Sequence, residues 1–534
     1  MIDKPFIPGF AELRAISPEL WLVAAIVAVL LTPFFTRKSN AICALVAIAG
    51  LAVALIAAIR LGSGEVYANS PLRQLIVVDH LAILWKVMLY LFVIGIILMW
   101  FSTTASTMHE GDGPEFFTLL LGATVGMSLM ASTSNLLMLI LCVEMASLPS
   151  YVLAGFRKTN RIGAEASLKY VLFGAATSAI MAYGLSILYG LYGTLSVSEL
   201  AARMAAGTTP SPALLAVATF GIICGLGFKI SAVPFHFWCP DVFEGASIDV
   251  SAFLSVASKG AGLILLMRIL TIVGQAAGFQ DMPAVSLTAI AIVIGVLGSI
   301  TATVGNTAAF VQNNIKRLLA YSSIAHAGYM LCALTLIIKH REIPAVASGD
   351  NLFSIPAGQA LLLYLAVYMF MNLGAFTVAG LIARETGSEN IQDYDGMGRR
   401  NPMLALCMAL FMFSLVGLPP MAGFVAKLNI MYVLGGNGGW WWALVAVIGL
   451  NTVFSLYYYM RVIRVMFLVP SDKPAISVNP LGAAIAVMCA VMLFLMFVGW
   501  NPLDRVTTGY GKVYMSVKAP GAPTTLPTTA VAER

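Results

Sequence analysis

Long, uninterrupted apolar stretches run through almost the whole sequence, and they limit the fold of the chain more than any other feature. A helix needs roughly 20 mostly apolar residues to cross the hydrocarbon core of a bilayer. The stretches lie at about residues 18–35, 41–60, 79–101, 116–131, 134–155, 166–192, 213–237, 248–273, 283–304, 317–338, 357–382, 403–433, 438–467 and 480–499. They lack the alternating pattern of strands in a membrane β-barrel. We therefore predict an all-α, polytopic membrane protein with about 14 transmembrane helices, whose backbone amides are paired within each segment.

The composition agrees with a chain embedded in lipid. Apolar residues make up 60% of the 534 residues and charged residues only 10%, whereas soluble domains have roughly 45–50% and about 25%. This excludes a soluble enzyme, a nucleic-acid binder and a disordered scaffold. The seven cysteines form no CxxC pair and are interpreted as small apolar side chains. We find no Rossmann fingerprint, Walker A loop or haem-attachment motif placed to hold a cofactor, and no removable signal peptide.

The basic residues in the connections predict the orientation. One set of alternate connections holds about twice as many Lys and Arg residues as the other, and cytoplasmic connections are the ones rich in these residues. The richer set contains Arg37, Lys38, Arg157, Lys158, Arg161, Lys316, Arg317, Arg384, Arg399, Arg400, Arg461, Arg464 and Lys473, and the poorer set contains Arg60, Arg73, Arg203, Arg268, Lys339 and Arg341. With an even number of helices, both termini should face away from the cytoplasm.

Two of the predicted helices contain prolines well inside the apolar stretch. The seventh holds Pro234 within GFKISAVPFHFW, and the twelfth holds Pro419 and Pro420 within GLPPMAGFVAK. Proline removes a helical hydrogen bond and clashes with the preceding turn, so we expect both helices to be broken. Because the breaks are five helices apart, we predict two inverted five-helix repeats, helices 4–8 and 9–13. Interrupted helices at matching positions of two repeats are typical of transport paths.

These repeats divide the chain into four regions. Residues 1–110 are predicted to form an N-terminal three-helix region, residues 111–275 the first repeat, residues 276–470 the second repeat, and residues 471–534 the last helix with its tail. The sequence after Trp500 is rich in Pro and Thr, which is typical of a short exposed extension.

Ionisable side chains inside apolar stretches are the strongest functional signal. A charged side chain at the centre of a membrane helix is disfavoured by about 2.5–3.5 kcal/mol on insertion scales, and such residues face a bundle interior or a wet cavity. The candidates are Glu144, Lys169, Lys229, His236, Lys259, His326 and Lys427. We expect them to share one polar interior.

Some of these residues also have a purely structural interpretation. Glu144 and Lys229 could form a buried ion pair. Lys169 could form a salt bridge at the membrane boundary with Glu165, four residues earlier. Lys86 lies close enough to the start of its helix to extend its ammonium group to the surface, and we interpret it in that way.

The remaining candidates favour a functional interpretation to different degrees. His236 and His326 could merely bond free backbone carbonyls. Lys229, Lys259 and Lys427 are harder to explain as structure, because no carboxylate lies close in sequence on the same helix face. Burial disfavours the charged form of a lysine, and a nearby carboxylate favours it. A glutamate–lysine pair whose distance changes can therefore load and release a proton, and a line of such lysines predicts a proton relay.

The residues around these candidates resemble a known family. The motifs are GFKISAVPFHFWCPDVFEGA (227–246), ASKGAGL (257–263), NNIKRLLAYSSIAHAGYML (313–331), LPPMAGFVAKL (418–428), EMASLPSYVLAGF (144–156) and EASLKYVLFGA (165–175). Together they resemble the antiporter-like subunits of respiratory complex I, and among these the subunit N family of bacterial NADH-quinone oxidoreductases. Subunits L and M and the Mrp-type antiporters typically carry a PLHxWLPDA-like stretch instead of PFHFWCPDVFEGA. The resemblance covers most of the chain, from about Asp79 to Arg464.

The resemblance implies a proton-translocating subunit that couples electron transfer from NADH to quinone with proton pumping. In that family, the residue matching Glu144 modulates the lysine matching Lys229. Lys259 matches the central connecting residue, and Lys427 matches the exit-side lysine on the second broken helix. The family's other axis residues are matched by Lys169, His236 and His326.

The resemblance also implies where cofactors and partners lie. The chain itself should hold no cofactor or metal, since FMN, the iron–sulfur clusters and the quinone belong to partner subunits. The expected partners are a neighbouring antiporter-like subunit, small membrane subunits and the lipid bilayer. The expected location is the bacterial inner membrane, with both termini on the periplasmic side.

The sequence departs from the family at three positions, and two other functions stay open. Cys239 stands where the family usually has Thr, and Ser247 and Asp249 replace part of a Pro-rich GAPxPV stretch. Asp249 thus adds an unexpected charge at the start of the eighth helix. The alternative functions are a stand-alone or Mrp-like cation/proton antiporter, and a structural subunit that only joins its neighbours.

Overall fold

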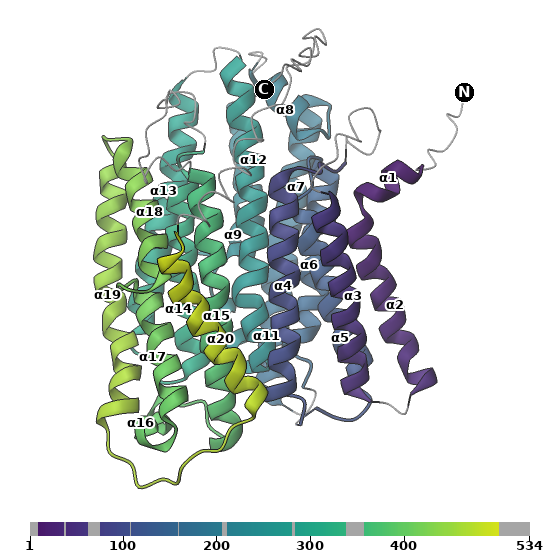
Figure 1. Ribbon diagram of the computed structural model, residues 1–534. Helices are drawn as coiled ribbons and strands as arrows, with labels where there is room; N and C mark the ends of the chain where they lie inside the picture. Colours follow the sequence, from purple (N-terminus) through teal and green to yellow (C-terminus); the bar gives the residue numbers. More distant parts are fainter. Residues whose placement is uncertain are drawn as a thin grey trace, which may run out of the picture.

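The computed structural model is a bundle of helices that lie side by side, as Figure 1 shows. It describes residues 9–36, 39–61, 75–106, 108–157, 160–205, 211–279, 284–337 and 357–500, and within these ranges it contains no β-strand. The helices up to the first predicted break are α1 (Phe10–Ala15), α2 (Ser17–Phe35), α3 (Asn40–Arg60), α4 (His80–Thr103), α5 (Gly113–Met130), α6 (Leu136–Ala154), α7 (Arg161–Tyr192), α8 (Val197–Ala205) and α9 (Pro212–Ile230). Those that follow are α10 (Trp238–Gly245), α11 (Ile248–Phe253), the π-helix η3 (Leu254–Ser258), α12 (Lys259–Phe279), α13 (Ala284–Ala309), α14 (Ile315–Leu334), α15 (Ala357–Thr386), the 3-10 helix η4 (Ile391–Tyr394), α16 (Met397–Arg400), α17 (Pro402–Val416), α18 (Ala422–Gly436), α19 (Trp441–Leu468) and α20 (Pro480–Val498).

The predicted fold class is confirmed. Each apolar stretch overlaps one helix or a series of shorter ones, and 12 helical segments among the described residues are long and apolar enough to cross a membrane. Two shorter apolar helices, α17 and α18, share the stretch predicted as one broken helix. The count of about 14 membrane helices and the repeat symmetry stay predictions.

Side-chain caps fix where several helices begin. Asp79 accepts a hydrogen bond from Ala82 N at 2.9 Å at the start of α4, and Asn135 accepts one from Leu137 N at 2.9 Å at the start of α6. Asn314 caps α14 in the same way, by accepting from Lys316 N at 2.8 Å. The first amides of a helix have no partner within it, and each of these caps supplies a side-chain acceptor for one or two of them.

Both predicted breaks are present, and the first corrects a predicted boundary. The stretch 213–237 is not helical to its end: α9 ends at Ile230, Ser231 adopts a left-handed conformation, and Pro234 lies in the connection to the short α10. The second break follows α17, where Gly417 has φ +87° and α18 begins only at Ala422. Each break ends a helix inside the bundle and leaves its last carbonyls free for other donors.

The helix after the first break has an irregularity that the sequence did not predict. The stretch 248–273 begins as α11, passes through the π-helix η3 and continues as α12, whose first residue is Lys259. Single π-turns inside α-helices are rare and occur frequently at functional sites. Here the turn ends directly before a lysine in the predicted polar interior.

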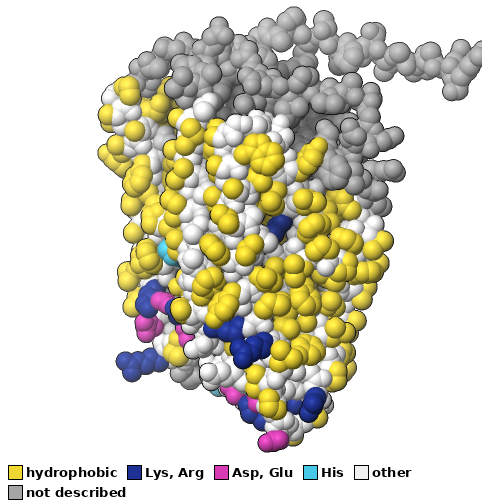
Figure 2. Space-filling view, turned by 90° about the vertical axis from the view of Figure 1, so that its left-hand side faces the viewer, with side chains coloured by type: hydrophobic (Ala, Val, Ile, Leu, Met, Phe, Trp, Pro, Cys, Tyr) yellow, Lys and Arg dark blue, Asp and Glu magenta, His cyan; other side chains and the backbone are white. Residues whose placement is uncertain are grey.

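Charged side chains gather toward one end of the bundle, as Figure 2 shows on one face. Ion pairs join the connections at that end: Lys316 to Glu389 at 2.7 Å, and Lys473 to Asp395 at 2.8 Å. These connections belong to the basic set that was predicted to share one side of the membrane. Arg37, Lys38 and Lys158 of that set lie outside the described residues.

One member of the opposite set was misplaced. Arg268 does not lie in a connection: it is buried in α12, and its guanidinium donates to both oxygens of Asp79 at 2.8 and 2.9 Å and to the Ala131 carbonyl at 2.7 Å. Since Asp79 also caps α4, this ion pair joins α12 to the start of α4. The orientation of the chain in the membrane stays a prediction.

Candidate functional site

The three lysines that lack a carboxylate nearby in sequence are all buried in the middle of the bundle. Lys229 and Lys259 are each 1% exposed, and Lys427 is 4% exposed. They come from three different helices, α9, α12 and α18. Because a buried ammonium group needs hydrogen-bond acceptors to offset its lost hydration, their partners define what the site can do.

Lys229 is held by α6. Its ammonium donates to the Ser147 hydroxyl at 3.1 Å, and the charge that acts on it through space is that of Glu144, one turn earlier on α6. One carboxylate oxygen of Glu144 is buried and has no hydrogen-bond partner among the described residues. The two groups therefore interact through their charges, and the hydrogen bond of the ammonium goes to Ser147.

Lys259 joins helices on two sides of it. Its ammonium donates to the Ser323 hydroxyl of α14 at 2.5 Å and to the Cys239 sulfur of α10 at 3.4 Å, and it lies 5.5 Å from the centre of the Phe243 ring. Cys239 is the residue that departs from the family pattern. A cysteine sulfur is a weak acceptor, so Ser323 is the stronger of the two partners.

His326 lies between Lys259 and Lys427. It follows Ser323 by one turn of α14, and the charges of both lysines act on it. Its Nδ1 atom is bonded to the Tyr364 hydroxyl at 2.7 Å. Each imidazole nitrogen can either donate or accept, so the ring can pass a proton between its two sides.

Lys427 is held by backbone instead of side chains. Its ammonium donates to the carbonyls of Leu415 at 2.9 Å and Val416 at 2.8 Å, the last residues of α17 before the break. The ammonium also lies 4.9 Å from the centre of the Tyr329 ring, a distance typical of a cation–π contact. The break in the helix thus creates the binding site for this lysine, because in an unbroken helix those carbonyls would accept from the next turn.

The two remaining candidates differ in position. His236 lies in the connection between α9 and α10 and is buried, and the charge of Lys259 acts on it. We call the residues Glu144, Lys229, His236, Lys259, His326 and Lys427 the buried row. Lys169, in contrast, does not belong to it. Its side chain is 40% exposed and pairs with Glu165 at 2.8 Å and with Asp241 at 2.7 Å, so it lies in a charged cluster that also includes Arg317.

One buried ion pair was missed. Lys86 does not reach the surface: it is 1% exposed, and its ammonium lies 2.8 Å from the carboxylate of Glu19 on α2. The structural interpretation of Lys86 was therefore wrong, because α3 and α5 pack against α4 and α2 packs against both of them, which brings Glu19 within reach. Glu19, near the start of the first apolar stretch, was the signal that could have revealed the pair.

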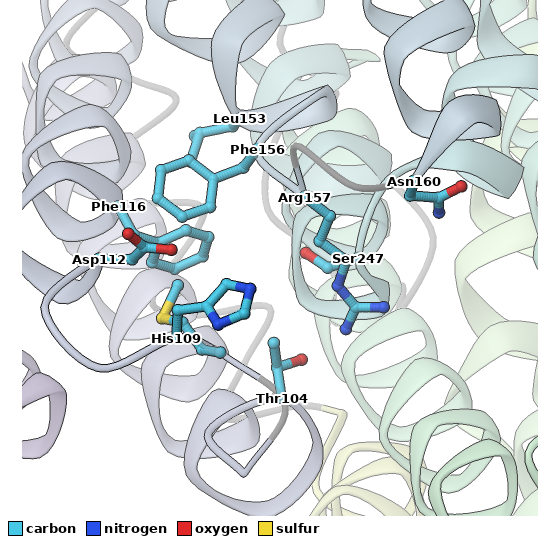
Figure 3. Close-up of a pocket in the computed structure, with 10 residues that line it drawn as sticks. Thr104, His109, Asp112, Phe116, Leu153, Phe156, Arg157, Asn160 and Ser247 are labelled. Carbon is cyan, nitrogen blue, oxygen red and sulfur yellow. The ribbon is translucent and has the colours of Figure 1, made fainter.

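A cavity of about 340 Å³ opens near the charged end of the bundle (Figure 3). Its wall combines the start of α5 with the connection between α6 and α7, and it includes His109, Arg157 and Thr104. The Thr104 hydroxyl donates at 2.8 Å to Asp249, which is fully buried and whose second oxygen has no hydrogen-bond partner in the described ranges. The unexpected charge of Asp249 is thus one hydrogen bond away from the cavity wall.

The chemistry available at the site is proton transfer. Its polar groups are amines, imidazoles, hydroxyls and carboxylates, all of which can hold a proton. Within the described part of the chain, no three His, Cys, Asp or Glu side chains lie close enough together to hold a metal ion.

Comparisons with known proteins agree with this arrangement. A family described as "NADH:quinone oxidoreductase/Mrp antiporter, TM" matches residues 133–455. The NADH-quinone oxidoreductase subunit N of Anaeromyxobacter sp. (strain Fw109-5) is 40% identical over 520 residues, which cover 92% of this chain and 95% of the relative.

Solved structures share the fold. A chain of respiratory complex I from Thermus thermophilus with bound aureothin superposes with a TM-score of 0.72 at 29% identity, and covers 91% of this chain and 98% of its own length. A chain of the Mrp complex from Dietzia sp. DQ12-45-1b superposes with a TM-score of 0.76 at 20% identity, and covers 94% of this chain and 98% of its own. The second likeness concerns the fold alone.

Proposed function

The chain belongs to the subunit N family of the NADH-quinone oxidoreductases, and we propose that its buried row from Glu144 to Lys427 carries protons through it. It is a multi-pass subunit of the membrane arm of complex I in the bacterial inner membrane, where electron transfer from NADH to quinone drives proton pumping. The FMN, the iron–sulfur clusters and the quinone lie in partner subunits. The neighbours of the chain are another antiporter-like subunit and the small membrane subunits.

The observation that carries the proposal is that Lys229, Lys259 and Lys427 are buried, each with acceptors at hydrogen-bond distance. A buried amine that loses its proton becomes neutral and escapes the penalty of a buried charge. Each lysine can therefore exist in two states within the same pocket, which a pump needs in order to load and release a proton.

The first part of the relay is the modulation of Lys229 by Glu144. When the ammonium moves from Ser147 toward Glu144, the carboxylate stabilises its charge, and when it moves away, the lysine releases its proton more readily. His236 lies in the connection between α9 and α10, and the charge of Lys259 acts on it. We propose that His236 exchanges protons with Lys259.

The second part leads from Lys259 to Lys427. Ser323 accepts a hydrogen bond from Lys259, and the charges of both lysines act on His326, one turn further along α14. In the proposed relay, Ser323 and His326 therefore connect the two lysines. Lys169 lies at the edge of the relay, where its ion pair with Asp241 joins it to the charged cluster that includes Arg317.

The competing function, a stand-alone or Mrp-like antiporter, predicts a different assembly. Membranes that carry an affinity-tagged copy of the chain should give a native-gel band that stains for NADH dehydrogenase activity and contains the tag. Deletion of the chain should abolish NADH-driven acidification of inverted vesicles. A tagged chain that migrates entirely apart from the NADH-staining band would favour the antiporter function.

We further propose that the charged end of the bundle faces the cytoplasm, because the basic connections meet there. Asp472 and Ser198 are exposed near opposite ends of the membrane helices. An Asp472→Cys variant should react with a membrane-impermeant maleimide only after cells are permeabilised, and a Ser198→Cys variant should react in intact spheroplasts. The reverse pattern would overturn the orientation and leave the fold untouched. The native cysteines give little background in this test, because all seven are buried.

A further inference from the structure

The ion pair between Glu19 and Lys86 lies outside the row described above, and it is as deeply buried as the lysines of that row. Lys86 is 1% exposed and Glu19 is 5% exposed, and their charged atoms are 2.8 Å apart. The partners come from the N-terminal helices α2 and α4, which the resemblance to the family does not assign to the relay.

The surroundings of the pair are polar but incompletely bonded. The Ser128 hydroxyl of α5 donates to one oxygen of Glu19 at 2.5 Å, and the Tyr90 hydroxyl lies 2.8 Å from Ser128. The second oxygen of Glu19 is buried and has no hydrogen-bond partner among the described residues. A purely structural ion pair needs all of its lone pairs satisfied to offset desolvation. Glu19 is therefore less completely bonded than the carboxylate of a purely structural ion pair, and the oxygen that faces Lys86 lies 2.8 Å from its ammonium nitrogen.

The pair also lies close to the first half of the row. Gly126, two residues before Ser128, packs directly on α6, since a Cβ atom there would lie 2.4 Å from the Ala146 nitrogen, two residues after Glu144. On the other side, Trp85 packs against Gly260, the residue that follows Lys259. The charges of Glu19 and Lys86 both act on Cys142, two residues before Glu144.

We propose that Glu19 and Lys86 form a proton-exchanging pair that extends the row beyond Glu144 into the N-terminal helices. In the exchange, an N–H bond of the Lys86 ammonium breaks as an O–H bond forms on Glu19. The pair changes from two opposite charges to a neutral amine and a neutral acid, with no net uptake of protons. The change in the field next to α6 then alters how strongly Glu144 holds the Lys229 charge. This inference rests on the proposed function.

Lys86→Arg is the first test. Arginine keeps the positive charge and the ion pair but does not give up its proton at accessible pH. We expect the variant complex to assemble, to retain electron transfer from NADH to a hydrophilic artificial acceptor, and to lose most of its proton pumping in inverted vesicles. Wild-type pumping by the assembled variant would overturn the proposal.

A charge-free double variant, Glu19→Leu with Lys86→Met, is the second test and guards against a folding failure. Replacing both members of a buried pair by apolar residues is often neutral for stability, whereas removing one leaves an uncompensated charge. We expect the double variant to assemble better than either Glu19→Leu or Lys86→Met alone, but to pump poorly. A double variant that pumps like the wild type would show that the pair is structural only.

Two controls make the outcomes separable. Asp79→Asn with Arg268→Gln neutralises another ion pair outside the row, in which Arg268 is buried and Asp79 is half-buried, and this variant should assemble and pump normally. Lys229→Ala tests the row itself. If Lys229→Ala stops pumping while the charge-free variant still pumps, the inference about Glu19 and Lys86 fails and the proposed function stands. If Lys229→Ala still pumps, the proposed function fails as well.

Discussion

The two broken helices hold their lysines by different means. Near the first break, Lys229 is held by side chains of another helix: the Ser147 hydroxyl, with Glu144 one turn away on α6. At the second break, Lys427 is held by two main-chain carbonyls of α17, the helix that ends just before its own. A buried lysine can thus be accommodated either by a titratable neighbour or by the free end of a helix.

This difference determines which lysine can be switched. We propose that the first site is the one that responds to events elsewhere in the protein, because the attraction between a carboxylate and an ammonium group depends on the distance between them. Backbone carbonyls at a helix C-terminus carry a fixed partial negative charge that does not titrate. The second site therefore offers Lys427 a constant environment, and we propose that this lysine gains or loses its proton in response to its neighbours in the row.

The largest effect is expected from Lys229→Ala, which removes the switched lysine. Coupled NADH–quinone turnover and proton pumping should fall to near background. Electron transfer from NADH to a hydrophilic artificial acceptor should persist, because we propose that the redox centres lie in other subunits. Lys169→Ala is the matched control: its side chain is 40% exposed, and we expect it to retain most pumping. Loss of artificial-acceptor activity in a fully assembled Lys229→Ala complex would contradict the assignment.

The next largest effect on pumping is expected from Glu144→Gln, which neutralises the carboxylate that acts on Lys229. Glu144→Gln should assemble at near-normal levels and lose most pumping, because Lys229 can then shed its charge without a carboxylate to restore it. Glu144→Asp should keep most activity, since the Coulomb interaction depends on distance and shortening the side chain changes it only moderately. Activity assays in membranes, normalised to complex content on native gels, would measure both. Wild-type pumping by the Gln variant would remove Glu144 from the mechanism.

An intermediate effect is expected from the backbone at the second break. Gly417 has φ +87°, and a Cβ atom there would lie 3.0 Å from Cδ of Lys427. A side chain in this conformation costs about 1–2 kcal/mol, so Gly417→Ala should lower both the thermal stability and the pumping rate of the complex. At the first break, Ser231 has φ +63°, and Ser231→Gly relieves that conformation. It should leave pumping unchanged, because Lys229 is held from α6. Equal losses in the two variants would argue that both sites are built by backbone.

The smallest effect is expected from the exposed ion pairs of Lys473, in the connection between α19 and α20. Lys473 pairs with Asp393 at 3.2 Å and with Asp395 at 2.8 Å, and exposed ion pairs are worth about 0–1 kcal/mol. Hydrogen bonds from Ser388 and Lys473 lower the pKa of Asp393, and bonds to Asp395 and Asp393 raise the pKa of Lys473. The contribution of ionised Asp393 to the stability of the fold is fully present above the ordinary pKa of an aspartate, and it is lost as the pH falls through the lowered pKa of Asp393. The contribution of charged Lys473 to stability is fully present below the ordinary pKa of a lysine, and it is lost as the pH rises through the raised pKa of Lys473.

Both charges are therefore in place around neutral pH. Lys473→Met should lower the midpoint of thermal inactivation slightly and by the same amount from about pH 6 to about pH 9. Pumping per NADH should not change. A shift that varies steeply across this range would mean that another titrating group holds this end of the bundle together.

The sequence by itself determined the helices, the places where two of them break, and most of the ionisable residues of the row. These features are local: lipid forces each segment to satisfy its own backbone, so a long apolar run must be a helix. The prolines at 234, 419 and 420 lie at breaks in such runs, whereas Pro149 stays inside α6. Only the tertiary structure decided the partners. Whether Lys86 reaches the surface or meets Glu19, whether Lys169 joins the row or stays at its edge, and whether Lys427 binds a side chain or the end of α17 depend on which helices pack together. A lysine side chain is long and flexible enough to reach several neighbours, so neither its burial nor its acceptor follows from its place along the chain. The neighbouring helices bury Lys86 and leave Lys169 40% exposed.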